Sequence, residues 1–337
     1  MTTNTILEVK DLKKHYSQNR GILSTFKGES GSIPAVDGVS FYIREKETMG
    51  LVGESGCGKS TVCRSIMGLT PVTSGSIVFD GTEITSLSPS AFLPLREEIQ
   101  MIFQDLDAAL NPKMRIRAIL REAVTVFNKL GDDEADRRIG ELLEQVNLKS
   151  SKLSSFPHEL SGGEKRRVGI ARALAVGARF LVADEPTSAL DVSIQAQIVN
   201  LLRDLQANLG LSYLFISHDL RVVELVSHKV AVMYLGKIVE MGLAGAIANQ
   251  PLHPYTRTLW SSLVEKRSIE GSSSMQRRRT DWGVFDFQRP MSGCRFAARC
   301  PVYHEKGKPS ICTDPASEPE LLDVPGNHKV ACHFPLK

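Results

Sequence analysis

A phosphate-binding loop is the feature that most constrains how this chain can fold. Residues 53–60 match the pattern G-x-x-x-x-G-K-S and directly follow the apolar residues 49–52, as a strand, loop and helix unit requires. The matching residues, with the threonine that follows them, are Gly53, Glu54, Ser55, Gly56, Cys57, Gly58, Lys59, Ser60 and Thr61. The glycines allow successive backbone N–H groups to point at phosphates, and the following helix adds its positive end. We therefore predict a nucleotide site in an α/β fold.

A second apolar run, residues 180–183, ends in two adjacent carboxylates, Asp184 and Glu185. Open α/β sheets place their ligand chemistry at the carboxyl ends of buried parallel strands. We expect Lys59 to supply a charge to the phosphates, and Ser60 and Asp184 to hold Mg²⁺, mostly through water. Successive residues at a strand end point in different directions, so Glu185 is free to orient an attacking water. The sequence therefore predicts a magnesium-dependent nucleotide site at which a water can be oriented for attack.

The third motif is the signature segment, Leu-Ser-Gly-Gly-Glu at residues 160–164. Ser161 and Glu164 have the spacing of a capping box, so one interpretation is simply the start of a helix. A helix N-terminus with two glycines is also a phosphate site. Because the chain contains no second phosphate loop to use it, we expect this site to serve another subunit.

With these three motifs the chain resembles the ATPase subunits of ABC transporters. The resemblance implies a head-to-tail dimer in which ATP is sandwiched between Lys59 of one subunit and the signature segment of the other. The residues that it places at the site in trans are Ser161, Gly162, Gly163 and Asp191, the last in a loop that crosses the interface. The partner is a second ABC ATPase subunit, either a copy of this chain or a related one.

The same resemblance assigns roles to single residues. It makes Glu185 the catalytic base and His218 a switch residue that contacts the γ-phosphate. Gln104 corresponds to a glutamine that senses the γ-phosphate and Mg²⁺, and Tyr16 is the aromatic residue expected to stack on adenine. Without the resemblance, a lone histidine or a glutamine after a strand would indicate nothing about function.

The order of apolar runs indicates an α/β fold with a mostly parallel sheet, and the resemblance implies that it is an ABC-type P-loop ATPase core. We expect an N-terminal antiparallel β part from residues 6–11 and 35–52, and a helical signature subdomain at about residues 105–165. A small Cys-rich extension completes the fold. The predicted domains are an ABC ATPase domain at 1–265, a Gly/Ser- and Arg-containing linker at 266–290, and the metal-binding C-terminal extension at 291–337.

Composition excludes several functions. Apolar residues make up 42% of the chain and charged residues 23%, and the formal net charge is +3, which is too small to argue for nucleic acid or a polybasic membrane anchor. The N-terminus is polar, and no run approaches the ~18 apolar residues of a membrane span. We expect a peripheral protein at the cytoplasmic face of the cell membrane, without a nucleic-acid partner.

Four of the six cysteines fall in the last 44 residues: Cys294, Cys300, Cys312 and Cys332. Cytoplasmic thiols stay reduced, so disulfides are not expected. The spacing lacks the C-x-x-C pairs usual for zinc, while four thiolates suit a [4Fe–4S] cluster. With His-Pro-Tyr-Thr-Arg at 253–257, the tail is similar to the C-terminal extension of dipeptide and oligopeptide importer ATPases. That resemblance implies an iron–sulfur cluster. Zinc and plain packing cysteines remain alternatives.

The predicted function is therefore to power import of dipeptides or oligopeptides. The implied partners are two transmembrane permease subunits and, indirectly, an extracytoplasmic peptide-binding protein. Importers of nickel complexes, glutathione-like peptides or oligosaccharides use similar subunits. A chromosome-organising or repair ATPase would carry a long coiled-coil insertion before the signature segment, and a translation-associated one normally carries two cassettes; this chain has neither.

Overall fold

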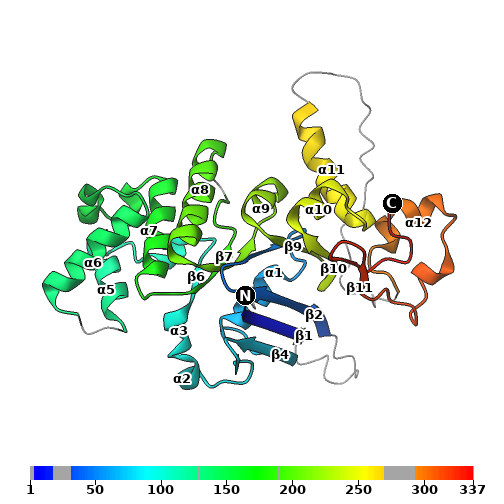
Figure 1. Cartoon of the computed structure of the whole chain (residues 1–337), viewed down its shortest axis with the longest axis horizontal. Coiled ribbons are helices and arrows are strands. Elements are labelled where there is room, and N and C mark those ends of the chain that lie inside the picture. The colour runs from blue at the N-terminus through cyan, green and yellow to red at the C-terminus, as the bar shows by residue number, and fades with distance from the viewer. Residues whose placement is uncertain (1–3, 18–31, 128–129, 189, 269–292, 337) are drawn as a thin grey trace, which may run out of the picture.

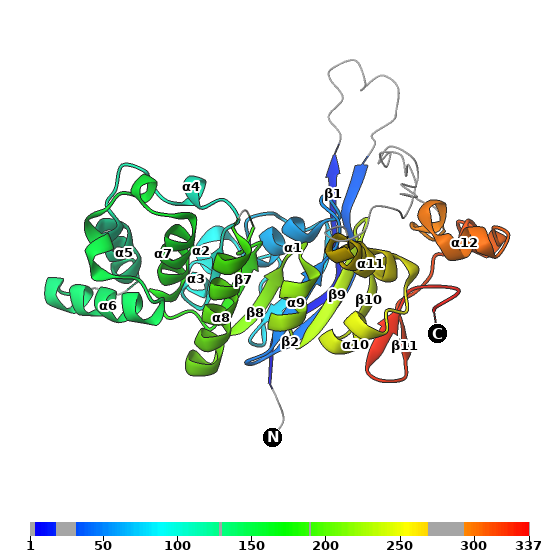
Figure 2. The same cartoon turned by 90° about the horizontal axis from the view of Figure 1, so that it is seen from above.

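The structure is a computed structural model that describes residues 4–17, 32–127, 130–188, 190–268 and 293–336. Two sheets form its centre, with helices packed on one of them (Figure 1). In the view from above, α12 (Pro301–Glu305) of the C-terminal extension lies at one end of the molecule, and α5 (Ile116–Thr125) and α6 (Asp132–Gln145) lie at the other (Figure 2).

The larger sheet has eight strands in the order β11-β12-β10-β9-β3-β8-β7-β6. Its strands are β3 (Thr48–Val52), β6 (Ile99–Ile102), β7 (Phe180–Asp184), β8 (Ser212–Ile216), β9 (Lys229–Tyr234), β10 (Lys237–Leu243), β11 (Leu322–Val324) and β12 (His328–Val330). The five strands from β9 to β6 pair in parallel, whereas β9, β10, β12 and β11 pair antiparallel. The expectation of an α/β core is confirmed, with a mixed sheet in which the strands from β9 to β6 are parallel, and β9 and β10 form the expected hairpin.

The smaller sheet has the order β2-β1-β4-β5, and its strands pair antiparallel. Its strands are β1 (Thr5–Ser17), β2 (Ser32–Arg44), β4 (Ser74–Phe79) and β5 (Thr82–Glu83). One expectation is wrong here, because residues 48–52 lie in the larger sheet and not in the N-terminal one. A tight turn after Arg44 sends the chain across, and all five residues of β3 are buried on both faces.

The helices follow from the alternation of apolar runs and loops. They are α1 (Lys59–Ile66), α2 (Pro89–Phe92), α3 (Leu95–Glu98), α4 (Leu106–Ala109), α5 (Ile116–Thr125), α6 (Asp132–Gln145), α7 (Gly162–Leu174), α8 (Val192–Leu209), α9 (Leu220–Val226), α10 (Ala244–Asn249), α11 (Pro254–Ser268) and α12 (Pro301–Glu305). Among the described residues, no helix has the length and apolarity needed to cross a membrane.

Side chains alternate across the larger sheet and so divide the core in two. On β7, Leu181 and Ala183 pack with the helices α5 to α10, while Phe180 and Val182 pack with α1 and the smaller sheet. Helix α1 therefore lies between the two sheets, directly after β3. This sandwich holds the phosphate loop, residues 53–60, at the carboxyl ends of β3 and its neighbours.

The described part of the C-terminal extension, residues 293–336, is not a separate small fold. Its strand β12 pairs with β10, and its buried residues Phe296, Cys300 and Val302 belong to the same core as the helices of the ATPase part. The predicted boundary at residue 265 falls inside α11, and residues 269–290 of the predicted linker lie outside the described residues. The extension therefore completes an existing sheet.

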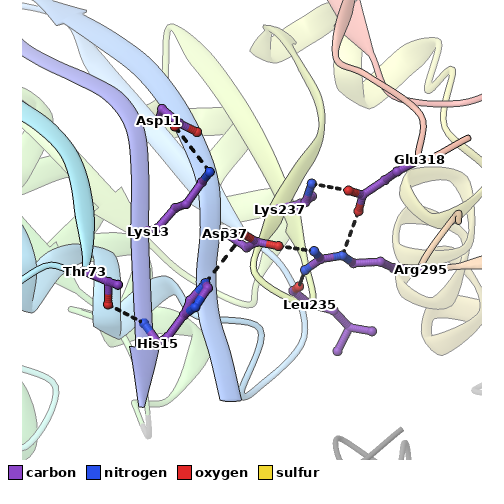
Figure 3. A network of polar contacts seen from close by, with 9 residues as sticks. All are labelled: Asp11, Lys13, His15, Asp37, Thr73, Leu235, Lys237, Arg295 and Glu318. Carbon is purple, nitrogen blue, oxygen red and sulfur yellow. Dashed lines mark hydrogen bonds and ion pairs between the residues drawn. The ribbon is translucent and has the colours of Figure 1, made fainter. Parts of the chain in front are cut away.

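A polar network also joins the extension to the smaller sheet (Figure 3). Arg295 donates to a carboxylate oxygen of Asp37 on β2, to the backbone oxygen of Leu235 at 2.5 Å and to Glu318 at 3.0 Å. Lys237 on β10 contacts the same Glu318 at 2.5 Å. These contacts connect the extension to β2, to β10 and to the turn between β9 and β10.

Candidate ATP site

The glycines of the phosphate loop are required by close backbone approach. A Cβ on Gly58, which has φ +110°, would lie 2.1 Å from the backbone oxygen of Ala35. A Cβ on Gly53, at φ +154°, would lie 2.2 Å from the backbone oxygen of Met233. Positive φ values and these contacts admit only glycine without movement of the backbone. The loop is thus fixed between β2 and β9.

The side chain of Lys59 points back into the phosphate loop. Its ammonium group donates to the backbone oxygens of Gly53 and Glu54, both at 2.8 Å, and the side chain is buried. In the described part of the chain, the amides of Ser55, Gly56 and Gly58 have no hydrogen-bond acceptor. The loop therefore presents three free donors and one buried cation, which is the chemistry of a phosphate site.

Ser60 and Asp184 meet at the carboxyl end of β7. A hydrogen bond joins their side chains. Burial raises the pKa of Asp184, as does the charge of Glu185, while the Ser60 hydrogen bond and the charge of Lys59 act in the opposite direction. Within the described residues, Asp184 Oδ1 is buried without a hydrogen-bond partner. A buried carboxylate oxygen with no donor beside a serine hydroxyl fits the oxygen ligands that Mg²⁺ prefers.

Next to Asp184, the side chain of Glu185 contacts those of Gln104 and His218. Gln104 donates through Nε2 to Glu185 Oε2 at 2.9 Å, and His218 Nδ1 lies 3.3 Å from Glu185 Oε1. The three residues follow β6, β7 and β8, neighbouring strands of the parallel sheet. Glu185 has φ +45°, which is uncommon for a residue with a side chain and is concentrated at functional sites. The site therefore holds one carboxylate between two polar side chains.

The signature segment begins α7, in the group of helices at the left of Figure 1, whereas α1 lies below the centre of the sheet. Ser161 Oγ accepts from the amide of Glu164 at 3.3 Å, and Glu164 accepts from the amide of Ser161 at 3.0 Å. The capping box is thus formed. Gly162 and Gly163 pack against side chains of Leu190 and Ile194, where an added Cβ would lie at 3.1 and 2.8 Å. The exposed face of Ser161 and Gly162 is free for a ligand from outside.

The remaining predicted residues lie around this centre. Thr61 is half-buried in the first turn of α1, and Asp191 is the exposed residue before α8. Tyr16 is 40% exposed near the end of β1, with the Lys14 ammonium 5.0 Å from its ring centroid. It pairs with Ile33 on β2, the strand that also carries Ala35 against Gly58.

Sequence reasoning missed Arg166. It lies on α7, is 5% exposed, and donates to the backbone oxygens of Phe103 at 2.8 Å and Gln104 at 3.3 Å. A further bond reaches the backbone of Ser188 at 3.5 Å. Burial lowers the pKa of this guanidinium. Arg166 joins the signature helix to the segments that carry Gln104 and Ser188. Its only signal in the sequence was a charged residue at a core position of a helix.

The four cysteines of the extension line one small cavity of about 10 Å³ beside His253 and Phe334. Burial raises the pKa of Cys294 to about 11 and that of Cys332 to about 12, and neighbouring cysteines raise both. The amide of Cys294 donates to the backbone oxygen of Cys312 at 2.9 Å. Within residues 293–336 and the other described ranges, no three histidine, cysteine or acidic side chains are placed to hold a metal ion. Cys57 and Cys63 are buried, as expected of packing residues.

Comparison with known proteins decides the family. Residues 36–188 match the family model of ABC transporters, and residues 239–306 match that of the oligopeptide/dipeptide transporter C-terminal region. The oligopeptide transport ATP-binding protein AppF of Bacillus subtilis is 44% identical over 98% of this chain and 97% of its own length. The chain belongs to the ABC transporter ATP-binding proteins. OppF of Escherichia coli, also an oligopeptide transport ATP-binding protein, is 41% identical over 97% of this chain and 95% of its own.

Solved structures of this family share the fold. The ATP-binding cassette MJ0796, in a dimeric post-hydrolysis state bound to ADP and Pi, aligns with a TM-score of 0.63 and 26% identity. The match covers 71% of this chain and 98% of that one. CbiO1 of Clostridium perfringens, part of the ABC transporter complex cbiONQ, aligns with a TM-score of 0.63 and 27% identity, covering 79% and 95%. The resemblance to ABC transporter ATPases inferred from the three motifs is therefore confirmed.

Proposed function

We propose that this chain is the ATP-hydrolysing subunit of an oligopeptide importer. The observation that carries the proposal is the arrangement at the ends of β6, β7 and β8, where Gln104 and His218 hold Glu185 beside Asp184. The names of AppF and OppF, which match this chain over nearly its full length, support the peptide as cargo. Membership of the ABC family supports action at the cytoplasmic face of the membrane with two permease subunits and, indirectly, an extracytoplasmic peptide-binding protein.

Nucleotide binding uses the loop as a preformed cradle. The free amides of Ser55, Gly56 and Gly58 bind phosphate oxygens, and the Lys59 ammonium exchanges its two backbone acceptors for the β- and γ-phosphates. Tyr16 stacks on adenine. Ser60, Asp184 and Gln104 are the residues that would hold Mg²⁺, with Asp184 Oδ1 as the unpartnered oxygen. When bound, Mg²⁺ neutralises charge on the phosphates.

Hydrolysis needs a base that faces the γ-phosphate. Glu185 orients the attacking water and accepts its proton at one carboxylate oxygen. Gln104 and His218 each contact a different oxygen of that carboxylate, so both limit its rotation. When nucleotide binds, His218, whose side chain is 64% exposed, is free to turn toward the γ-phosphate. The phosphate loop and Mg²⁺ ligands bind without Glu185, so binding and hydrolysis are separable.

The site is completed by a second subunit. Ser161, Gly162 and Gly163 lie at the N-terminus of α7, which is thirteen residues long, and Ser161 and Gly162 are exposed there. Asp191 is the exposed residue before α8, and it follows Leu190, whose side chain lies against Gly162. In a head-to-tail dimer these residues face the γ-phosphate bound by the partner, in agreement with the dimeric cassette to which this fold is similar.

The extension is proposed to carry a [4Fe–4S] cluster on Cys294, Cys300, Cys312 and Cys332. The four thiols line one cavity and have the chemistry of such a cluster, with zinc as the alternative, although in the described residues they are not placed as metal ligands and would have to move together to bind one. We also propose a helical subdomain at about residues 105–165, and an extension from about residue 291 that packs on the ATPase part as a continuation of its larger sheet. Protein purified without oxygen should be brown, and Cys300→Ser should remove the colour. Colourless protein with stoichiometric zinc, or without metal, would reject the cluster.

Steady-state ATPase activity of Glu185→Gln tests the function. The variant should bind ATP as the parent does and lose at least ~100-fold in turnover, because general base catalysis contributes about 10²–10⁴-fold. Glu224→Gln, an exposed carboxylate on α9, is the matched control. Turnover of Glu185→Gln within a few-fold of the parent would exclude Glu185 as the base.

A further inference from the structure

One residue of the phosphate loop, Glu54, is bound by the C-terminal extension. Arg299 donates from Nη1 to Glu54 Oε2 and from Nη2 to Glu54 Oε1, both at 2.8 Å. The two residues are 245 positions apart in the sequence. Two parallel bonds between a guanidinium and a carboxylate fix orientation as well as distance. Any movement of the extension at Arg299 is therefore transmitted to the loop.

A second contact holds the backbone of the same residue. The amide of Glu54 donates to the hydroxyl of Tyr255 at 2.9 Å. Tyr255 is 1% exposed and belongs to the His-Pro-Tyr-Thr-Arg segment at the start of α11. Its ring packs on Tyr234 and on Phe296 of the extension, with centroids 4.6 and 5.4 Å apart. Glu54 is thus held by its side chain and its backbone from two segments that pack together.

Arg299 is itself held in place. Its guanidinium lies 5.8 Å from the ring centroid of Tyr234 and 5.9 Å from that of Phe296, and it donates to the Tyr234 hydroxyl at 3.4 Å. It ends a short 3-10 turn, Ala297–Arg299, directly before Cys300. The hydrogen bonds to Glu54 raise the pKa of Arg299, so the charge persists at any working pH. A cation seated on two rings loses little entropy when it binds a carboxylate.

The contact bears on nucleotide binding through Lys59. The backbone oxygen of Glu54 is one of the two acceptors of the Lys59 ammonium, at 2.8 Å. The carboxylate of Glu54 adds a negative charge to a loop built to receive phosphates, and an unpaired carboxylate there would repel them. Arg299 compensates that charge and holds it on the side of the extension.

We propose, on the basis of the ATPase function above, that Arg299 is a positioning residue for the phosphate loop, and that it acts through Glu54. The C-terminal extension is then part of the nucleotide-binding machinery, although it contributes no group that touches ATP. In the folded chain the residue before Cys300 contacts the loop.

The proposal predicts a change in KM without a matching change in kcat. Arg299→Gln should raise the KM for ATP about fivefold and weaken ATP binding by a similar factor, the upper range for a partly exposed ion pair, while kcat stays within about twofold. Arg299→Lys keeps the charge but not the two parallel bonds, so its KM for ATP should lie between that of the parent and that of Arg299→Gln. Arg117→Gln, which removes a surface ion pair with Asp136 on α5 and α6, is the control.

A double-variant cycle decides whether Arg299 acts through Glu54. In the Glu54→Gln background, Arg299→Gln should change KM by less than about twofold, because the partner is already gone. A fivefold increase in that background would overturn the proposal, as would an unchanged KM in Arg299→Gln alone.

Two further readouts separate the possible failures. Calorimetric titration with ATP in Mg²⁺ measures binding without hydrolysis. If the parent chain binds no ATP, the proposed function is wrong and the inference falls with it. If the parent binds ATP and Arg299→Gln binds it equally well, only the inference is wrong. If Arg299→Gln unfolds, Arg299→Lys and Glu54→Gln carry the test, and additive effects of these two on KM would overturn it.

Discussion

Replacement of His328 by alanine should loosen the C-terminal extension. Glu240 on β10 is fully buried, at 0% exposed, and its carboxylate accepts from three groups. The three groups are the amide of Leu252 at 2.6 Å, the amide of His253 at 2.9 Å, and Nε2 of His328, which lies 2.7 Å from Oε1. His328 comes from β12, so this one carboxylate connects the sheet, the segment before α11 and the extension.

The magnitude follows from what the alanine leaves behind. A hydrogen bond to a charged group contributes about 1.5–3 kcal/mol to stability. Two amide donors still satisfy Glu240 in the variant, but the lost ring also removes packing, so we take the upper end of that range, about 3 kcal/mol. The imidazole also packs against Gly242, where an added Cβ would lie 3.2 Å from its ring. Removal of the ring therefore leaves a gap and removes one of the two hydrogen bonds to Oε1 of Glu240.

Amide hydrogen exchange measures this loss locally. The amide of Ala331, which donates to the backbone oxygen of Val239 at 2.8 Å, should exchange about 100-fold faster in His328→Ala, the factor that ~3 kcal/mol gives. Amides of β7 should be unaffected. Combining the change with Glu240→Gln should restore part of the protection, since a neutral amide tolerates burial better. His158→Ala, an exposed histidine, serves as the control. An exchange rate of the Ala331 amide within threefold of the parent rate would refute the reasoning.

Three further changes test other parts of the structure. Gly58→Ala should abolish ATP binding while the chain still folds, because its Cβ would lie 2.1 Å from the Ala35 oxygen; titration with ATP checks this, and normal affinity would contradict it. Arg166→Leu should lower the free energy of unfolding by about 3 kcal/mol in urea titrations, since three backbone acceptors lose a buried donor, and a loss below ~1 kcal/mol would contradict it. Burial by itself raises the pKa of Asp37, but the hydrogen bond and charge of Arg295 outweigh it and lower the pKa. This contribution to stability is present above the pKa of the unfolded chain, about 4, and is lost as pH falls through the lower pKa of the folded chain. In urea titrations, the difference in free energy of unfolding between parent and Asp37→Asn should therefore shrink below about pH 4.

The parts of the site that sequence could predict are the local ones. The phosphate loop, the acidic end of β7 and the capping box of Ser161 and Glu164 each lie within one short segment, and their geometry follows from residue type and spacing. The meeting of Gln104, Glu185 and His218 also follows, because the carboxyl ends of neighbouring parallel strands share one edge. The roles of these residues came from the family resemblance.

The parts that sequence could not predict are the distant ones. Strands β11 and β12 have three residues each, too few for any alternation to be read, so their addition to the large sheet gave no signal. The pair of Arg299 and Glu54 joins two ends of the chain, and no local pattern distinguishes either residue from an exposed charge. Residues 48–52 were assigned to the wrong sheet because a buried strand looks the same in both.

The measurement that tests the account most directly is recovery of ATPase activity on mixing two inactive variants. Lys59→Ala removes the cation of the loop, and Ser161→Arg blocks the signature segment, so neither homodimer should hydrolyse ATP. Heterodimers carry one site with both lesions and one with neither, and a random mixture should regain about a quarter of parent activity. Differently tagged subunits, captured together, establish that heterodimers form. Recovery near that level is the predicted result, and no recovery in captured heterodimers would contradict a site shared between two subunits.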